Sequence, residues 1–101
     1  MSENRAINIT KGSDNVFEDL GFAPDEAASL KVRADLMLDL RKYIISQGWT
    51  QEQAAVFLGE TQPRISNLMN GDIARFSVDK LINMLARGGM EVRVEVLPKA
   101  A

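Results

Sequence analysis

Two short apolar-patterned segments on either side of one glycine constrain the fold of this chain more than any other feature. They lie in the stretch WTQEQAAVFLGETQPRISNLMNG, residues 49–71. On each side of Gly59 the apolar residues recur every three or four positions, which predicts an amphipathic helix. Gly59 can adopt the left-handed conformation that ends the first helix, and Thr61 can cap the second. The chain must therefore turn sharply between two short helices whose apolar sides face a common interior.

The boundaries of the other helices carry equally local signals. Thr50 and Gln53 form the capping-box pattern T-x-x-Q, and Phe76 can pack on Leu81 where the last helix begins. A glycine follows each of these apolar-periodic segments, as is common at helix C-termini. The predicted helices cover residues 24–47, 50–58, 62–70 and 78–87, with a further helical turn at 15–20. We therefore predict an all-α fold, a bundle of about five helices.

The last part of the chain changes to a period of two. In GMEVRVEVLPK the valines alternate with charged residues, which is typical of a half-buried β-strand. No strong partner strand is visible within the chain, so we predict antiparallel pairing with the same strand of a second chain. With Val94 opposite its own copy, Arg93 faces Glu95, which avoids like charges. The expected dimer contacts are Val92, Arg93, Val94, Glu95 and Val96.

The chain has the length of one domain with two extensions. Its 101 residues suffice for a single small core. We expect a mobile N-terminal arm at residues 1–13, a helical domain at 14–89, and a dimerisation strand with a tail at 90–101. Ile7 and Ile9 alternate with polar neighbours in the arm. The alternative to a dimer is therefore that the C-terminal strand pairs with residues 7–9, or only packs on its own domain.

Composition argues against several functions. The chain has no cysteine and no histidine, so the usual nucleophile–base pairs and the commonest metal ligands are missing. We therefore expect neither an enzyme nor a metal or cofactor site. No apolar run is long enough to span a bilayer, and the N-terminus lacks the apolar core of a signal peptide. Together with the absence of cysteine, this favours a cytoplasmic protein without membrane contact.

Charge is distributed unevenly along the chain. The formal net charge of −2 argues against a protein that coats nucleic acid non-specifically. All charged residues within 14–26 are acidic, whereas basic residues outnumber acidic ones within 62–87. Most of these charges can be explained as the solvated faces of helices. The asymmetry nevertheless permits a basic, DNA-facing end on an acidic molecule.

The two short helices combine into a helix-turn-helix pattern, in which two helices meet at a tight turn containing glycine. The inward positions are Ala54, Ala55, Leu58, Ile65 and Leu68. With Ile65 and Leu68 buried, the opposite side of the second helix faces outward, and Arg64 lies on its flank. The outward residues are Pro63, Ser66, Asn67 and Asn70, with Gln62 at the tip.

These outward residue types suit the edges of DNA bases. Glutamine and asparagine match adenine, whereas arginine matches guanine. Gln51, Asn70 and Arg75 flank the two helices where phosphate contacts are expected. There is a simpler explanation for each feature, because an exposed Gln or Asn is usually only solvated. The same fold can also serve as a pure protein-interaction module.

The motifs TQ-x-x-AA-x-x-LG, QPRIS-x-L-x-NG and RFS-x-D-x-L, preceded by SDNVFEDLGF, resemble the XRE class of helix-turn-helix regulators. The nearest likeness is to HigA-type antitoxins, and it covers residues 13–97. The resemblance implies a lambda-repressor-like bundle whose second short helix enters the major groove of double-stranded DNA. By position, the base-contacting residues would be Gln62, Pro63, Arg64, Ser66 and Asn67. The phosphate-contacting residues would be Gln51, Thr61, Asn70 and Arg75. Glu60 departs from the pattern, because relatives often have an apolar residue there; its carboxylate could weaken DNA affinity or point to solvent.

The resemblance also implies partners. Such regulators bind palindromic operators as homodimers and repress their own promoter, and HigA-type antitoxins neutralise a RelE/HigB-like toxin. A basic toxin would suit the acidic residues 14–26. The apolar residues there, Val16, Phe17, Leu20 and Phe22, could instead only cover the core of the protein. The implied function is therefore an autoregulating repressor and the antitoxin of a type II pair. The alternatives are an interaction module with little DNA binding, and a stand-alone phage-like repressor with no toxin.

Overall fold

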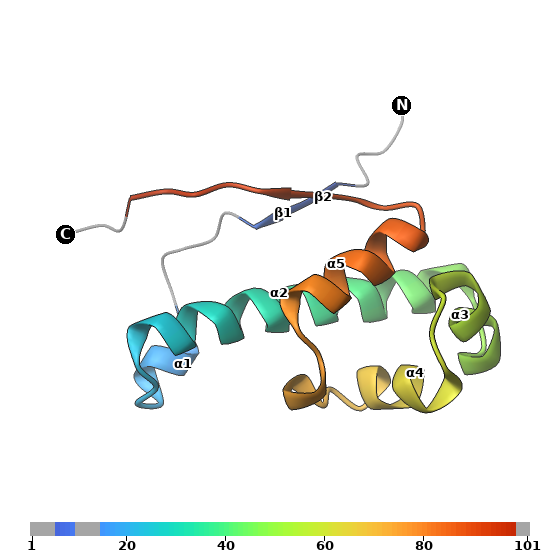
Figure 1. Ribbon diagram of the computed structural model, residues 1–101, viewed down its shortest axis with the longest axis horizontal. Coiled ribbons are helices and arrows are strands. Elements are labelled where there is room, and N and C mark those ends of the chain that lie inside the picture. The colour runs from blue at the N-terminus through green and yellow to red at the C-terminus, as the bar shows by residue number, and fades with distance from the viewer. Residues whose placement is uncertain (1–5, 10–14, 99–101) are drawn as a thin grey trace.

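The computed structural model describes residues 6–9, as backbone, and residues 15–98. The elements are β1 (Ala6–Ile9), α1 (Val16–Asp19), α2 (Pro24–Gln47), α3 (Gln51–Leu58), α4 (Gln62–Met69), the 3₁₀ helix η1 (Ile73–Arg75), α5 (Val78–Arg87) and β2 (Glu91–Val94). Figure 1 shows α2 running along the molecule, with α4 on one side of it and the two strands on the other. This mostly helical bundle with a C-terminal strand confirms the predicted fold class.

The helix boundaries follow the local signals in the sequence. Pro24 begins α2, and Gly48 ends it with a φ of 71°. The Thr50 hydroxyl accepts a hydrogen bond from the Gln53 N–H at 3.1 Å, and the Gln53 side chain accepts one from the Thr50 N–H at 2.9 Å. The Ser77 hydroxyl caps α5 by accepting a hydrogen bond from a backbone N–H in its first turn. The predicted helix ends are confirmed to within a residue, and η1 is the one described helix that the pattern did not predict.

The core lies where α2 meets the four helical segments that follow it. All five predicted inward positions of the helix-turn-helix are buried: Ala54, Ala55, Leu58, Ile65 and Leu68. Phe76 and Leu81 are also buried, as the predicted packing at the start of α5 requires. They join Leu36, Leu40 and Ile44 of α2 in one cluster. Each such side chain contributes about 1.5–3 kcal/mol when it leaves water, so this cluster fixes the orientation of α3, α4 and α5.

The strand at the end of the chain pairs within its own chain. β2 runs parallel to β1, with Ala6 beside Glu91 and Ile9 beside Val94. The expectation that the chain offers β2 no partner is therefore wrong, and residues 7–9, the stated alternative, provide it. The paired segment, β1, is only four residues long, which is too short for its alternating pattern to predict a strand clearly. The whole helical domain also separates it from β2 in the sequence. The rest of the predicted arm at 1–13 lies outside the described residues.

One half of the C-terminal segment packs on the domain and the other half does not. Met90 and Val92 lie against the core cluster. Val94 is 62% exposed and Val96 is 88% exposed. No second strand lies along the outer edge of β2 among the residues that the structure describes.

None of the helices within residues 15–98 has the length and apolar content needed to cross a membrane.

Candidate nucleic-acid interface

The corner between α3 and α4 depends on Gly59 for two reasons. Its φ of 68° lies in the left-handed region, which favours glycine. The Arg87 side chain of α5 also packs over it, so that a Cβ at this position would lie 2.5 Å from the Arg87 Nη1. The turn is therefore held from the outside by α5 as well as from the inside by the core.

The orientation of α4 is set by its two buried residues. Ile65 and Leu68 are 0% exposed, so the opposite side of this eight-residue helix faces outward. Gln62 and Pro63 are exposed at its first turn, and Ser66 and Asn67 are half-buried further along. The predicted polar tip therefore lies at the surface, with aliphatic side chains behind it.

Most backbone N–H groups in the first turn of α4 already have a hydrogen-bond acceptor within the chain. The Thr61 hydroxyl accepts a hydrogen bond from the Arg64 N–H at 3.3 Å, and Pro63 has no N–H. Among the first three residues of α4, the Gln62 N–H remains as the backbone donor for an outside group. The helix dipole still favours an anion at this end.

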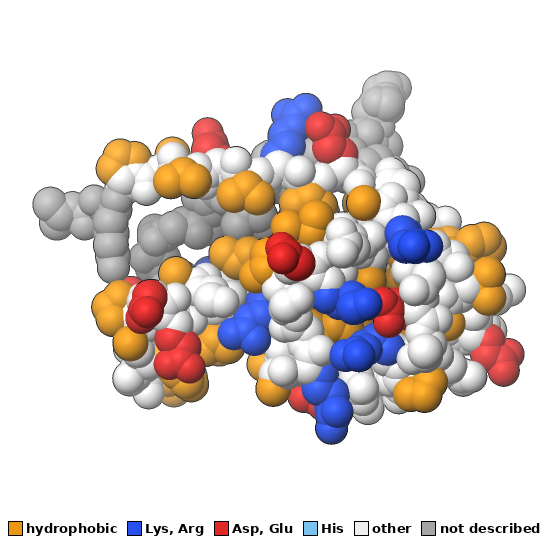
Figure 2. All heavy atoms as spheres, viewed as in Figure 1, with side chains coloured by type: hydrophobic (Ala, Val, Ile, Leu, Met, Phe, Trp, Pro, Cys, Tyr) orange, Lys and Arg blue, Asp and Glu red, His pale blue; other side chains and the backbone are white. Residues whose placement is uncertain are grey.

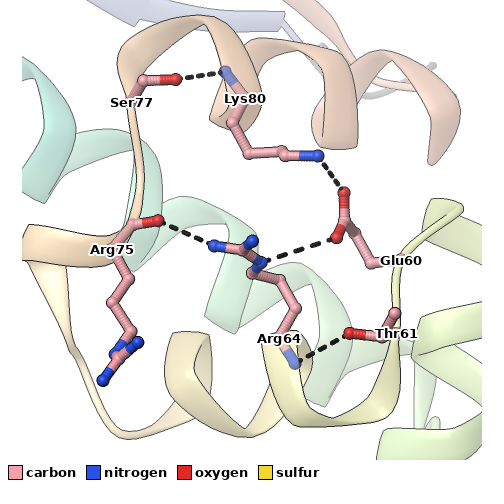
Figure 3. A network of polar contacts seen from close by, with 6 residues as sticks. All are labelled: Glu60, Thr61, Arg64, Arg75, Ser77 and Lys80. Carbon is pink, nitrogen blue, oxygen red and sulfur yellow. Dashed lines mark hydrogen bonds and ion pairs between the residues drawn. The ribbon is translucent and has the colours of Figure 1, made fainter.

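Arg64 is held against the protein by three groups (Figure 3). Its Nη1 donates to the Arg75 carbonyl oxygen at 2.9 Å, and its Nε lies 3.8 Å from Glu60 Oε1. The guanidinium carbon lies 5.6 Å from the centre of the Phe76 ring, which favours a cation. Arg64 therefore bridges α4 and the loop that precedes α5, and a bidentate contact to guanine would require it to release a partner.

Glu60 does not point to solvent. Its side chain is only 10% exposed, and its Oε2 lies 2.5 Å from the Lys80 Nζ on α5. The same carboxylate faces Arg64 through its other oxygen. Sequence reasoning set Glu60 aside and omitted Lys80 from the site. The apolar residue expected at position 60 was a signal that this side chain faces inward, but its partner is twenty residues away in the chain.

Arg75 lies in η1, and its carbonyl oxygen faces the Arg64 side chain of α4. Its Nε is 2.7 Å from Asp72 Oδ2, and both side chains are well exposed. Arg33 of α2 supports this loop by donating from Nη1 to the carbonyl oxygens of Ile73 and Phe76, each at 3.5 Å. Exposed ion pairs contribute little free energy, so a phosphate could take the place of Asp72 beside Arg75.

The structure brings part of the predicted site together. Arg64 joins two other predicted residues, because its backbone N–H donates to the Thr61 hydroxyl and its guanidinium donates to the Arg75 carbonyl oxygen. The Arg75 side chain itself points away from Arg64 (Figure 3). Asn70 caps the other end of α4, about 12 Å further along the axis from Gln62. Gln51 begins α3 and is exposed. Figure 2 shows Lys and Arg side chains gathered on the face of the molecule turned to the viewer, over α4 and α5.

A family model described as a helix-turn-helix domain matches residues 16–97. The match spans most of the chain, which therefore belongs to this family of DNA-binding regulators. The two helices that meet at the turn are α3 and α4. No curated protein matches the chain.

Proposed function

We propose that this protein is a dimeric repressor that recognises a palindromic operator through α4 in the major groove. The burial of α4 carries this proposal, because Ile65 and Leu68 are fully buried while Gln62 and Pro63 are exposed. A helix anchored in this way can enter a groove with its tip foremost.

The proposed contacts divide into those that read sequence and those that set position. The base-contacting residues are Gln62, Pro63, Arg64, Ser66 and Asn67, and the phosphate-contacting residues are Gln51, Thr61, Asn70 and Arg75. The amides of Gln62 and Asn67 can each donate and accept in one plane, which matches adenine N6 and N7. Because Arg64 is held by three groups of its own chain, the amides carry most of the proposed sequence choice.

Exposed valines support the proposed dimer. Val94 and Val96 remain largely in water, and a two-stranded sheet is only marginally stable by itself. Antiparallel pairing of the outer edge of β2 with its copy, centred on Val94, would cover both valines and place Arg93 opposite Glu95. The resulting twofold axis would present two copies of α4 about 34–36 Å apart, one turn of DNA.

The α1 region supports a second protein partner. Val16 is 56%, Leu20 68% and Phe22 40% exposed, so these side chains do not simply cover the core. Phe17 is half-buried and packs edge-on against Phe22. Acidic residues surround this apolar surface in the sequence. A basic toxin of the RelE/HigB kind would fit it, which makes the protein the HigA-type antitoxin of an autoregulated type II pair in the cytoplasm.

A second candidate function is a protein-interaction module that binds DNA little or not at all. The ion pairs within the site favour it, because Arg64 and Arg75 both already face carboxylates of their own chain. A stand-alone repressor with no toxin shares the DNA chemistry of the leading proposal.

Binding to its own upstream DNA separates these functions. We expect the purified protein to bind a duplex from upstream of its gene far more tightly than a scrambled duplex of the same length, measured by gel shift. Equal binding to both duplexes would contradict the repressor. Relief of growth arrest when the protein is produced together with the product of a small adjacent gene would support the antitoxin role, and its absence would leave the stand-alone repressor.

A further inference from the structure

The turn before α4 holds a nearly buried carboxylate between two cations. Glu60 lies within ion-pair distance of Lys80 and Arg64, and it is 10% exposed while they are 39% and 37% exposed. Arg64 belongs to the first turn of α4, and Lys80 belongs to the first turn of α5. Figure 3 shows the carboxylate reaching from the turn toward both of them. It therefore occupies one cation from the first turn of α4 and one from the first turn of α5.

Resting on the proposed function, we propose that Glu60 is an internal competitor of DNA phosphate. Its carboxylate neutralises Lys80 and Arg64 in the free protein and withholds both cations from the DNA backbone. Phosphate contacts raise affinity for every sequence, because each one releases condensed counterions. By removing such contacts, Glu60 makes binding depend more on the base edges that the α4 side chains reach.

The turn does not depend on Glu60 for its attachment to α5. The turn is already tied to α5 by buried apolar side chains, since Leu58, Leu81 and Leu85 are all 0% exposed. The Glu60–Lys80 pair lies at the surface of this contact, in a shallow depression that Arg87 also lines. Within residues 15–98 no carboxylate pairs with Arg87, so the surroundings of Glu60 carry a net positive charge that suits phosphate.

The first test compares Glu60→Gln with Asp79→Asn in the full chain. Both variants remove one negative charge, but Asp79 is exposed beside Lys80 and makes no ion pair among the described residues. Anisotropy titrations would use a scrambled duplex and the upstream duplex between about 50 and 200 mM salt. We expect Glu60→Gln to steepen the slope of log K against log salt by about 0.9 for each cation released. For each such cation, the variant should lose roughly threefold more affinity than the parent protein between the lowest and the highest salt concentration. Asp79→Asn should leave the slope unchanged, and equal slopes for the two variants would overturn the inference.

The second test needs no DNA. NMR relaxation of the Lys80 ammonium group should report greater mobility in Glu60→Gln than in the parent protein, because Glu60 is its ion-pair partner. Arg64 is not the probe here, since it keeps the Arg75 carbonyl oxygen and the Phe76 ring. Unchanged mobility would overturn the inference, whatever the DNA result. Thermal unfolding of both proteins at the same midpoint would show that the fold is retained.

A third variant, Lys80→Gln, approaches the pair from the other side. If Glu60 withholds Lys80, removing this cation should leave the salt slope of the parent protein unchanged. Flattening by about 0.9 would place Lys80 on a phosphate and overturn the inference. Failure of the parent protein to prefer its upstream duplex would instead overturn the proposed function, so the two failures are distinguishable.

Discussion

The helix α4 and the strand β2 differ in how much of their environment a single chain provides. The inward side chains of α4, Ile65 and Leu68, are entirely covered by helices of the same chain. β2 is covered at its beginning, where Val92 meets the core, but Val94 beyond it is 62% exposed. A single chain thus buries the whole inward side of α4, the proposed DNA-binding helix, but leaves the second half of β2 exposed. The proposed dimerisation through β2 would then set the distance between the two copies of α4, whereas the folding of α4 would not require the dimer.

The largest expected effect comes from breaking the anchor of α4. Ile65→Ala should lower the free energy of unfolding by about 2–5 kcal/mol, because it leaves a cavity in a fully covered site. Urea denaturation followed by circular dichroism measures this change. Val56→Ala on α3 is the matched control, since Val56 is 77% exposed and should change stability very little. Similar losses in the two variants would contradict the comparison between covered and open positions.

The next effect concerns the exposed tip of the same helix. Gln62→Ala should weaken operator binding by about 1–3 kcal/mol and relax the preference at one base pair, because an amide matched to adenine is lost. Gel shifts with single-base operator variants measure both changes. Gln47→Ala, at the exposed end of α2, is the control. Unchanged affinity in Gln62→Ala would mean that the tip does not read bases.

A smaller effect is expected at the open end of the strand. Val94→Lys places like charges opposite each other in the proposed pairing and removes a valine contact, so dimers should weaken by about 1 kcal/mol. Sedimentation over a concentration series measures the dimer constant. Val56→Lys adds the same charge to an exposed valine on α3 and should leave the dimer unchanged. A parent protein that remains monomeric at all concentrations would rule out the proposed interface.

The smallest effect is expected at Arg75. Arg75→Ala should weaken binding to all duplexes alike and flatten the salt slope by about 0.9, because one phosphate contact is lost without any base contact. Titrations at several salt concentrations measure the slope. Lys42→Ala, an exposed cation on α2, should leave the slope unchanged. A sequence-dependent loss in Arg75→Ala would instead assign this residue to base reading.

Prediction from the sequence succeeded where a signal lies close in the chain to the structure that it specifies. Thr50 and Gln53 cap α3 through hydrogen bonds that span three residues, and Gly59 ends the helix by its own backbone conformation. The burial of Ile65 and Leu68 follows from a period that one helix contains. The exposure of Gln62 and Pro63 at the tip of α4 was predictable for the same reason.

Prediction failed where the partners are distant in the chain. The pairing of β1 with β2 joins residues separated by the whole helical domain, and its register emerges only when both strands lie along α2 and α5. The ion pair of Glu60 is a similar case. The sequence allowed its carboxylate to point to solvent, and only the packing of α5 places Lys80 beside it. Arg64 was predicted as a flank residue that could reach the bases, and η1 holds it through the Arg75 carbonyl oxygen.

The sequence by itself determined the helices, their ends and the side of each helix that is buried, because caps and periodicity act within a few residues. Tertiary structure alone decided which strand meets β2 and which charges surround the tip of α4. Those outcomes depend on the distances between folded elements, and no local pattern in the chain encodes them. Glu60 depends on both levels. The local turn between α3 and α4 sets the position of its carboxylate, and the packing of α5 decides that Lys80 is its partner.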